Sequence, residues 1–229
     1  MLFLAVFCGF LAEYQLEHTI EKERAKKYIY SFYEDLVSDT VRMNSLLLYD
    51  DEKAEALNTM YACYDTVMQS ITSTACMAGL MKHSRSNRGF VLTDRTLKQL
   101  ANAGGYRLLN KGDADSIIKY ENLYKSYLDF QSTVFQGAQD NVRNTLNQFA
   151  NFKVTGQVIS ATTTLSSDTA SYKQNGDLLF VKDRALLKKW FNELAMYLRV
   201  TYSQRNIILQ LKTRANGLIA YFREKYHFK

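Results

Sequence analysis

The most restrictive feature of this sequence is that none of its 229 residues is proline. Proline removes a backbone donor and its ring clashes with the preceding turn, so it is the commonest interruption of a helix. A hydrophobic fraction of 47% and a charged fraction of 23% are ordinary for a folded chain and exclude wholesale disorder. The sequence therefore predicts an all-α fold with long helices.

Apolar residues recur at helical spacing along four long segments of the chain. We expect these helices at residues 2–48, 51–82, 113–151 and 183–226. Asp50 or Asp51 is the expected N-cap of the second helix, and Asp183 begins the last one. A shorter helix is expected between Thr93 and Gly104. Four long helices with one apolar stripe each predict an elongated antiparallel four-helix bundle.

The connection at residues 152–182 is long for a compact domain. Its segments 154–160 and 178–181 are strand-like and flank a turn signal, so a small hairpin inserted before the last helix is one interpretation. A loop without regular structure is the other. The predicted organisation is a membrane anchor at residues 1–16 and a helical-bundle domain at residues 17–229 that contains this insertion.

Leu2–Ala12 is a run of eleven residues without a polar side chain. Eleven helical residues reach about 16 Å, whereas the hydrocarbon core of a bilayer is about 30 Å thick. Three interpretations compete: a membrane helix whose first turns are missing, a signal peptide, and a buried helix of a soluble protein. We favour the first, with the lipid bilayer as partner, because no turn signal separates this run from the charged residues 17–27.

Two stretches, Phe3–Thr40 and Arg95–Tyr120, resemble an uncharacterised, N-terminally membrane-anchored helical family of Bacteroidota. The resemblance implies a single anchor with a helical domain behind it. It carries no assigned activity, so no functional residue is transferred. Members of the family have a basic stretch ahead of the apolar run, which this chain lacks.

The orientation in the membrane depends on the basic residues beside the apolar run. Lys22, Arg24, Lys26 and Lys27 follow it, and by the positive-inside rule they would keep the domain in the cytoplasm. A basic N-terminal stretch of the kind that the resemblance implies would instead place the domain in the periplasm. We favour a single-pass membrane protein with a periplasmic domain.

Positive charge is concentrated at the C-terminus of the chain. Residues 183–229 contain ten Lys and Arg against three Asp and Glu, a balance of +7, so the remainder sums to −1 of the total of +6. Such a segment can meet phosphates of lipid headgroups or of nucleic acid. We favour a solvated helix face and expect no nucleic-acid partner, because the basic residues are scattered and no nucleic-acid-binding motif occurs.

The three cysteines are Cys8, Cys63 and Cys76. Cys63 and Cys76 fall on one expected helix, thirteen residues apart, which is roughly 20 Å along a straight helix and too far for a disulfide. The spacing matches no metal-binding motif. We therefore expect three inert thiols and no metal or cofactor.

Polar residues interrupt two of the expected core stripes. Arg205 and Thr201 fall on the core face of the last helix, and Gln131 lies in the middle of the preceding stripe. A buried guanidinium needs a partner, which Asp39 or Thr40 could supply from the first helix. These five residues form the candidate polar core layer, which we interpret as structural in preference to ligand-sensing.

No catalytic motif occurs in the sequence, and the expected function is not enzymatic. We expect a membrane-anchored helical bundle that binds or scaffolds a protein partner at the cell envelope. A second copy of the chain, which would form a homo-oligomer, is a further candidate partner. A ligand-sensing extracytoplasmic bundle is the alternative. A basic soluble protein that binds nucleic acid is the second alternative.

Overall fold

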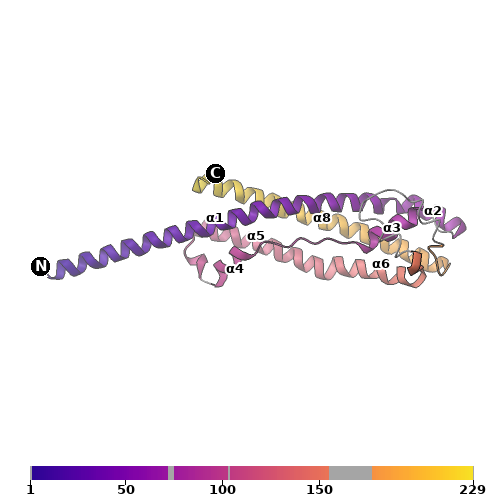
Figure 1. The fold of residues 1–229 in the computed structure, drawn as a ribbon, viewed down its shortest axis with the longest axis horizontal. Helices are drawn as coiled ribbons and strands as arrows, with labels where there is room; N and C mark the ends of the chain where they lie inside the picture. The colour runs from indigo at the N-terminus through magenta and orange to yellow at the C-terminus, as the bar shows by residue number, and fades with distance from the viewer. Residues whose placement is uncertain (1, 72–74, 103, 155–176, 229) are drawn as a thin grey trace. The chain divides into compact units, whose positions relative to one another are not determined.

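The computed structural model describes residues 2–71, 75–102, 104–154 and 177–228, and the side chains from residue 6 onward. These residues form an all-α protein, as predicted (Figure 1). The helices are α1 (Leu2–Asn58), α2 (Met60–Ser70), α3 (Ala75–Arg85), α4 (Arg95–Asn102), η1 (Gly105–Arg107), α5 (Lys111–Asp129), η2 (Phe130–Phe135), α6 (Gln136–Phe149) and α8 (Arg184–Tyr226).

The chain divides into two compact units. Unit 1 comprises residues 1–44, 90–125 and 210–229, and unit 2 comprises residues 45–89 and 126–209. Three long helical segments, namely α1, the run from α5 to α6, and α8, contribute to both units. Each unit is described by itself below.

Helix α1 is longer than predicted. It continues without a break through Asp50 and Asp51, which were expected to cap a second helix, and ends at Asn58. Both carboxylates instead bind side chains of α8: Asp50 accepts hydrogen bonds from Gln204, and Asp51 pairs with Arg205. The prediction that Asp50 or Asp51 caps a second helix is therefore wrong, because both residues lie inside α1 and their carboxylates bind side chains of α8.

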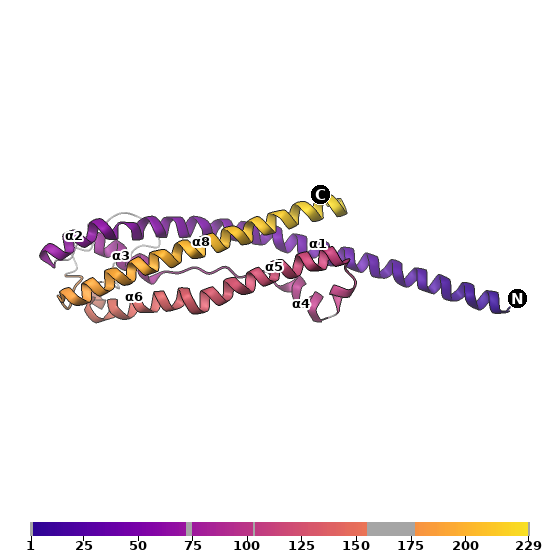
Figure 2. The same ribbon diagram turned by 180° about the vertical axis from the view of Figure 1, so that it is seen from behind.

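The second long helix that the sequence predicted is replaced by two short ones. Ile71 follows α2 in the left-handed conformation (φ 47°), and its N–H donates to the carbonyl of Val67 at 2.8 Å. Helix α3 then packs against both α2 and α6 within unit 2 (Figure 2). The prediction of four long helices is therefore wrong: in the part of the chain that the structure describes, a pair of eleven-residue helices stands in place of the second long helix.

This fold-back brings Cys63 and Cys76 together. Their Cα atoms lie 5.7 Å apart and the two residues form a disulfide. The expected separation of roughly 20 Å assumed one straight helix, and the break after α2 removes that assumption. Two of the three predicted thiols are thus cross-linked, while Cys8 is free and exposed.

The other helices match their predictions closely. Asp183 caps α8, because its Oδ1 accepts the N–H of Ala185 at 2.7 Å and that of Leu186 at 3.2 Å. The predicted helix at 113–151 runs from Lys111 to Phe149, but a π-helical turn, η2, interrupts it. Helix α4 occupies the predicted position of the short helix.

Most of the predicted insertion, residues 155–176, lies outside the described residues. At its far end, Leu179 forms an isolated antiparallel bridge with Ala150, and the N–H of Phe180 donates to the carbonyl of Phe149 at 2.7 Å. The strand-like segment 178–181 therefore pairs with the end of α6.

Each unit has its own aromatic core. In unit 2, Trp190 packs edge-on against Phe149 with ring centres 5.4 Å apart, and Phe135 packs against Tyr197 at 5.5 Å. In unit 1, Phe32 of α1 contacts Tyr120 and Phe222 at 6.2 and 6.3 Å. All these rings except that of Phe32, which is 1% exposed, are fully buried.

Candidate functional site

The structure separates the five residues of the predicted polar layer. Arg205 is not buried: its side chain is 34% exposed and pairs with Asp51, with Nη2 and Oδ2 3.3 Å apart. The prediction that Asp39 or Thr40 is its partner is wrong. Thr40 donates to the carbonyl of Val37 on its own helix at 2.8 Å.

Asp39 is buried in unit 1 and binds Thr93, which lies two residues before the start of α4. Its carboxylate accepts the N–H of Thr93 at 3.2 Å and the hydroxyl of Thr93 at 2.7 Å, and it pairs with Arg42. Thr201 is buried in unit 2, where its hydroxyl donates to the carbonyl of Tyr197 at 2.9 Å. Neither residue joins a shared polar layer with Arg205.

A different polar network, centred on Gln204, occupies the core of unit 2. The side-chain amide of Gln204 donates to both oxygens of Asp50, at 2.8 and 2.9 Å, and its oxygen accepts a hydrogen bond from Gln131. Asp50 and Gln204 are fully buried. Gln131 is thus the one predicted residue that belongs to this network, which ties α1, η2 and α8 together.

Lys53 continues the network one turn along α1. It is fully buried, and its Nζ donates to the carbonyl of Ser86 at 3.0 Å and to the hydroxyl of Tyr197. The ammonium also lies 4.3 Å from the ring centre of Tyr197 and 5.0 Å from that of Phe135. Gln139 of α6 donates to the same tyrosine hydroxyl at 3.1 Å.

Burial shifts the pKa of both ionisable groups toward their neutral forms. Desolvation raises the pKa of Asp50 to about 6, although Gln204 and Lys53 favour its charged form. Desolvation lowers the pKa of Lys53 to about 7, against the attraction of Asp50 and with a smaller repulsion from Arg143. Each charge is stabilised by fewer groups than in water, which is the physical reason for both shifts.

Asp50 and Lys53 were not predicted because the first helix was expected to end at Leu48, and Gln204 was not predicted because Arg205 was expected on the core face of the last helix. Once α1 continues, Met43, Leu46, Asp50, Lys53 and Leu57 follow one another at spacings of three and four residues, which define one helix face. All five are buried. That spacing is the signal by which the network could have been found.

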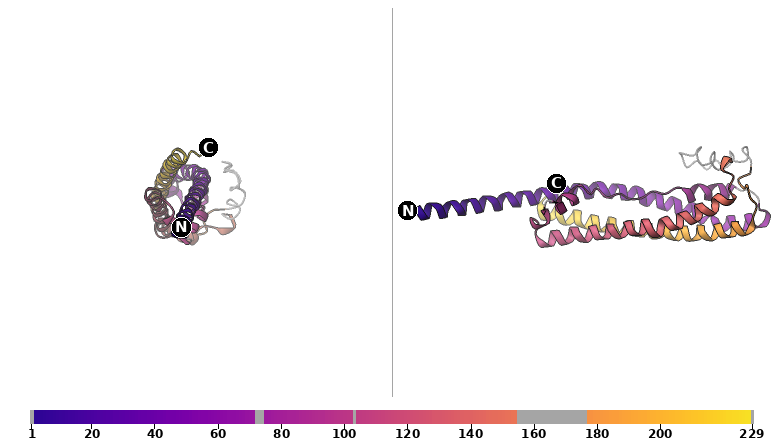
Figure 3. Two further views of the ribbon diagram at one scale, coloured as in Figure 1. Left: turned by 90° about the vertical axis from the view of Figure 1, so that its left-hand side faces the viewer. Right: turned by 90° about the horizontal axis from the view of Figure 1, so that it is seen from below.

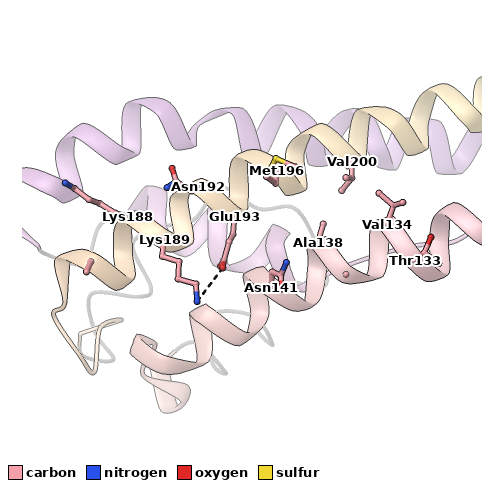
Figure 4. Close-up of a pocket in the computed structure, with 12 residues that line it drawn as sticks. Thr133, Val134, Ala138, Asn141, Lys188, Lys189, Asn192, Glu193, Met196 and Val200 are labelled. Atoms are coloured by element: carbon pink, nitrogen blue, oxygen red, sulfur yellow. Dashed lines mark ion pairs between the residues drawn. The ribbon is translucent and has the colours of Figure 1, made fainter.

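The surface of unit 2 carries a groove of about 790 Å³ between the η2–α6 segment and α8 (Figure 4). Val134, Ala138, Met196 and Val200 give it an apolar section. The polar section is formed by Lys188, Lys189, Asn192, Glu193 and Asn141. The groove therefore has an apolar part and a part with two lysines.

The wall of the groove includes a π-helical turn. Thr133 and Val134 lie in η2, and such turns occur frequently at functional sites. Across the groove, Glu193 Oε1 lies 3.9 Å from Lys189 Nζ, while Glu193 Oε2 is buried without a hydrogen-bond partner among the described residues. An incoming donor would satisfy that oxygen.

Within the described part of the chain, no group of three His, Cys, Asp or Glu side chains is arranged to hold a metal ion. No helix in the same part has a stretch long and apolar enough to cross a membrane. Compared with protein-family models, with curated proteins and with solved structures, the chain matches none of them.

Proposed function

We propose that this protein is a membrane-associated binding protein of the cell envelope, without catalytic activity of its own. The N-terminal part of α1 would enter lipid, and the helical units would bind a protein partner. One observation carries the proposal: every side chain from residue 6 to residue 24 is exposed, although many are large and apolar. Phe10, for example, is 67% exposed.

Within unit 1, the first turns of α1 extend past the C-terminal end of α8 (Figure 3). Seven large apolar side chains of this segment are exposed to solvent. They are Val6, Phe7, Phe10, Leu11, Tyr14, Leu16 and Ile20. Complete burial of one such side chain is worth about 1.5–3 kcal/mol, so this segment gains free energy from any apolar environment.

A helix that is apolar all round suits insertion into the acyl region better than an orientation flat on the headgroups. The apolar run Leu2–Ala12 reaches about 16 Å along the helix axis, about half of the hydrocarbon core. The proposal is therefore that α1 inserts into lipid and tethers the chain.

The disulfide between Cys63 and Cys76 favours an oxidising compartment for unit 2. Disulfides persist in secreted and periplasmic proteins and are rare in the reducing cytosol. This supports a periplasmic location for the helical units. We also propose that, within unit 2, the α2–α3 pair takes the place of the fourth helix in an antiparallel bundle.

The nucleic-acid alternative has less support, because several basic side chains of α8 have partners. Lys225 Nζ lies 2.7 Å from Asp113, Arg223 donates to the hydroxyl of Tyr33 at 2.9 Å, and Arg205 pairs with Asp51. A phosphate would have to compete with these contacts.

Flotation of the full chain with liposomes of phosphatidylethanolamine and phosphatidylglycerol tests the lipid tether. We expect the protein to float with the vesicles and the double variant Phe7→Asp/Phe10→Asp to stay at the bottom of the gradient. The matched control, Leu48→Asp/Val91→Asp, places the same charges on exposed apolar positions elsewhere and should float. Equal behaviour of the two variants, or no flotation of the unmodified chain, contradicts the proposal.

A further inference from the structure

We propose that the groove of unit 2 binds an amphipathic helix of a protein partner. The partner's apolar residues would pack on Val134 and Met196, and its acidic residues would meet Lys188 and Lys189. This inference rests on the proposed partner-binding function and names the surface and the kind of partner.

The dimensions of the groove suit a helix. Its lining on α8 extends from Ala185 to Val200, which is fifteen helical rises or about 22 Å along the axis. On the opposite side the lining extends from Thr133 to Asn141. Val134 and Met196 are 48% and 57% exposed, so the groove is open to solvent. Small molecules are usually enclosed over most of their surface, whereas a helix of three or four turns lies in an open groove of this kind.

Gly137 makes room on the α6 side of the groove. No described atom lies within 4 Å of the position that a Cβ would take at this residue. Glycine is less favourable than alanine inside a helix. The space at this residue lets a partner's side chain or backbone approach α6 closely.

The charge of the groove selects an acidic partner. Lys188 has no carboxylate of the described residues within ion-pair distance, and the ion pair of Lys189 with Glu193 is long, at 3.9 Å. Both lysines are exposed, and Figure 4 shows Lys189 directed toward α6 and Lys188 directed away from it at the same end of the groove. Opposite charges on the partner would fix its direction in the groove. A second copy of this chain fits less well, because the chain has a net charge of +6.

Selection of helical peptides from a phage-displayed library on the full, disulfide-bonded protein tests this inference. We expect the enriched peptides to carry apolar residues at helical spacing and a net negative charge. Their affinity for the Lys188→Glu/Lys189→Glu variant should fall at least tenfold, and Val134→Lys/Met196→Lys should also abolish binding. The control Lys98→Glu/Lys119→Glu reverses two exposed lysines of unit 1 and should bind within twofold of the unmodified protein.

Three results would overturn the inference. Enriched peptides whose affinity is unchanged by the groove variants would bind elsewhere, so the partner-binding function would stand and the groove assignment would fall. A selection that enriches no peptide would count against both. Sedimentation of the unmodified chain as a dimer that the groove variants dissociate would show that a second copy occupies the groove. Liposome flotation is independent of all three, because the groove variants leave α1 intact.

Discussion

Lys53 and Tyr197 meet in the core of unit 2, where the lysine Nζ lies 4.3 Å from the centre of the tyrosine ring and donates to its hydroxyl. Both side chains are fully buried. Lys53 has no ion-pair partner among the described residues, and burial favours its neutral form because it penalises the charge. The stability of unit 2 therefore depends on pH in a way that single substitutions reveal.

Replacing Lys53 by Met should remove one component of this pH dependence. The pKa of Lys53 is lowered to about 7 in the fold. Between pH 7 and its ordinary value of 10.5, the unfolded chain binds more protons than the folded one, so stability rises with pH there and is lost as pH falls through 7. From pH 7 to pH 9 the unmodified protein should gain about 2 kcal/mol relative to the variant.

Urea denaturation at both pH values measures this difference. Lys98→Met, a change at an exposed lysine, is the control and should keep the wild-type pH dependence. Parallel stability curves for the unmodified protein and Lys53→Met would show that the buried amine does not titrate in this range.

Asp50→Asn should have the complementary effect at acidic pH. Burial raises the pKa of Asp50 to about 6 from 3.8, so its contribution to stability is complete below pH 3.8 and is lost as pH rises through 6. From pH 4 to pH 6 the unmodified protein should lose about 2 kcal/mol relative to the variant. Asp51→Asn, at the exposed neighbour, serves as the control in the same denaturation experiment, and an equal loss in both variants would contradict the assignment to Asp50.

Removing the disulfide should destabilise unit 2. The double variant Cys63→Ser/Cys76→Ser frees a loop with a sequence separation of 13 residues, and cross-links of this loop size contribute about 3 kcal/mol. Thermal unfolding of the variant should begin at a lower temperature, and the same shift should appear in the unmodified protein with reductant present. Cys8→Ser, at the exposed free thiol, should unfold like the unmodified protein. Peptide mapping without reductant that finds free Cys63 would contradict the cross-link.

Asp113→Ala should loosen the C-terminal part of α8 in unit 1. The buried carboxylate accepts hydrogen bonds from Tyr221 at 2.8 Å, from Lys225 at 2.7 Å and from Tyr226. Loss of the shared acceptor leaves these donors unpaired and should lower the free energy of unfolding by about 3 kcal/mol. Hydrogen exchange should also become faster in α8 near Tyr226, whereas Asp115→Ala, at an exposed position on the same helix, should change neither quantity.

Gly137→Ala should raise stability. A methyl group at this position meets no described atom, and alanine is favoured over glycine inside a helix by about 0.5–1 kcal/mol. The same change should weaken binding of the peptides that the groove selects. A destabilised variant would mean that the position is filled from elsewhere, and the change in melting temperature decides between these outcomes.

The helices themselves could largely be read from local sequence. The cap at Asp183, the short helix after Thr93 and the end of the long segment at Phe149 lie where residue types and apolar spacing predict them. These features depend on contacts within a few residues, for which the sequence contains all the information. The same local reasoning failed at Asp50, since an aspartate that can cap a helix can equally accept hydrogen bonds from a distant glutamine.

Local pattern was sufficient for the all-α class and for the positions of α4 and α8, because helix formation responds to neighbours three and four residues away. The turn at Ile71, the disulfide that it permits, and the pairing of Gln204 with Asp50 depend on residues far apart along the chain. Such residues come together only when the helices pack. Helix packing also determines that Arg205 pairs with Asp51 at the surface and that Lys53 is buried in the core.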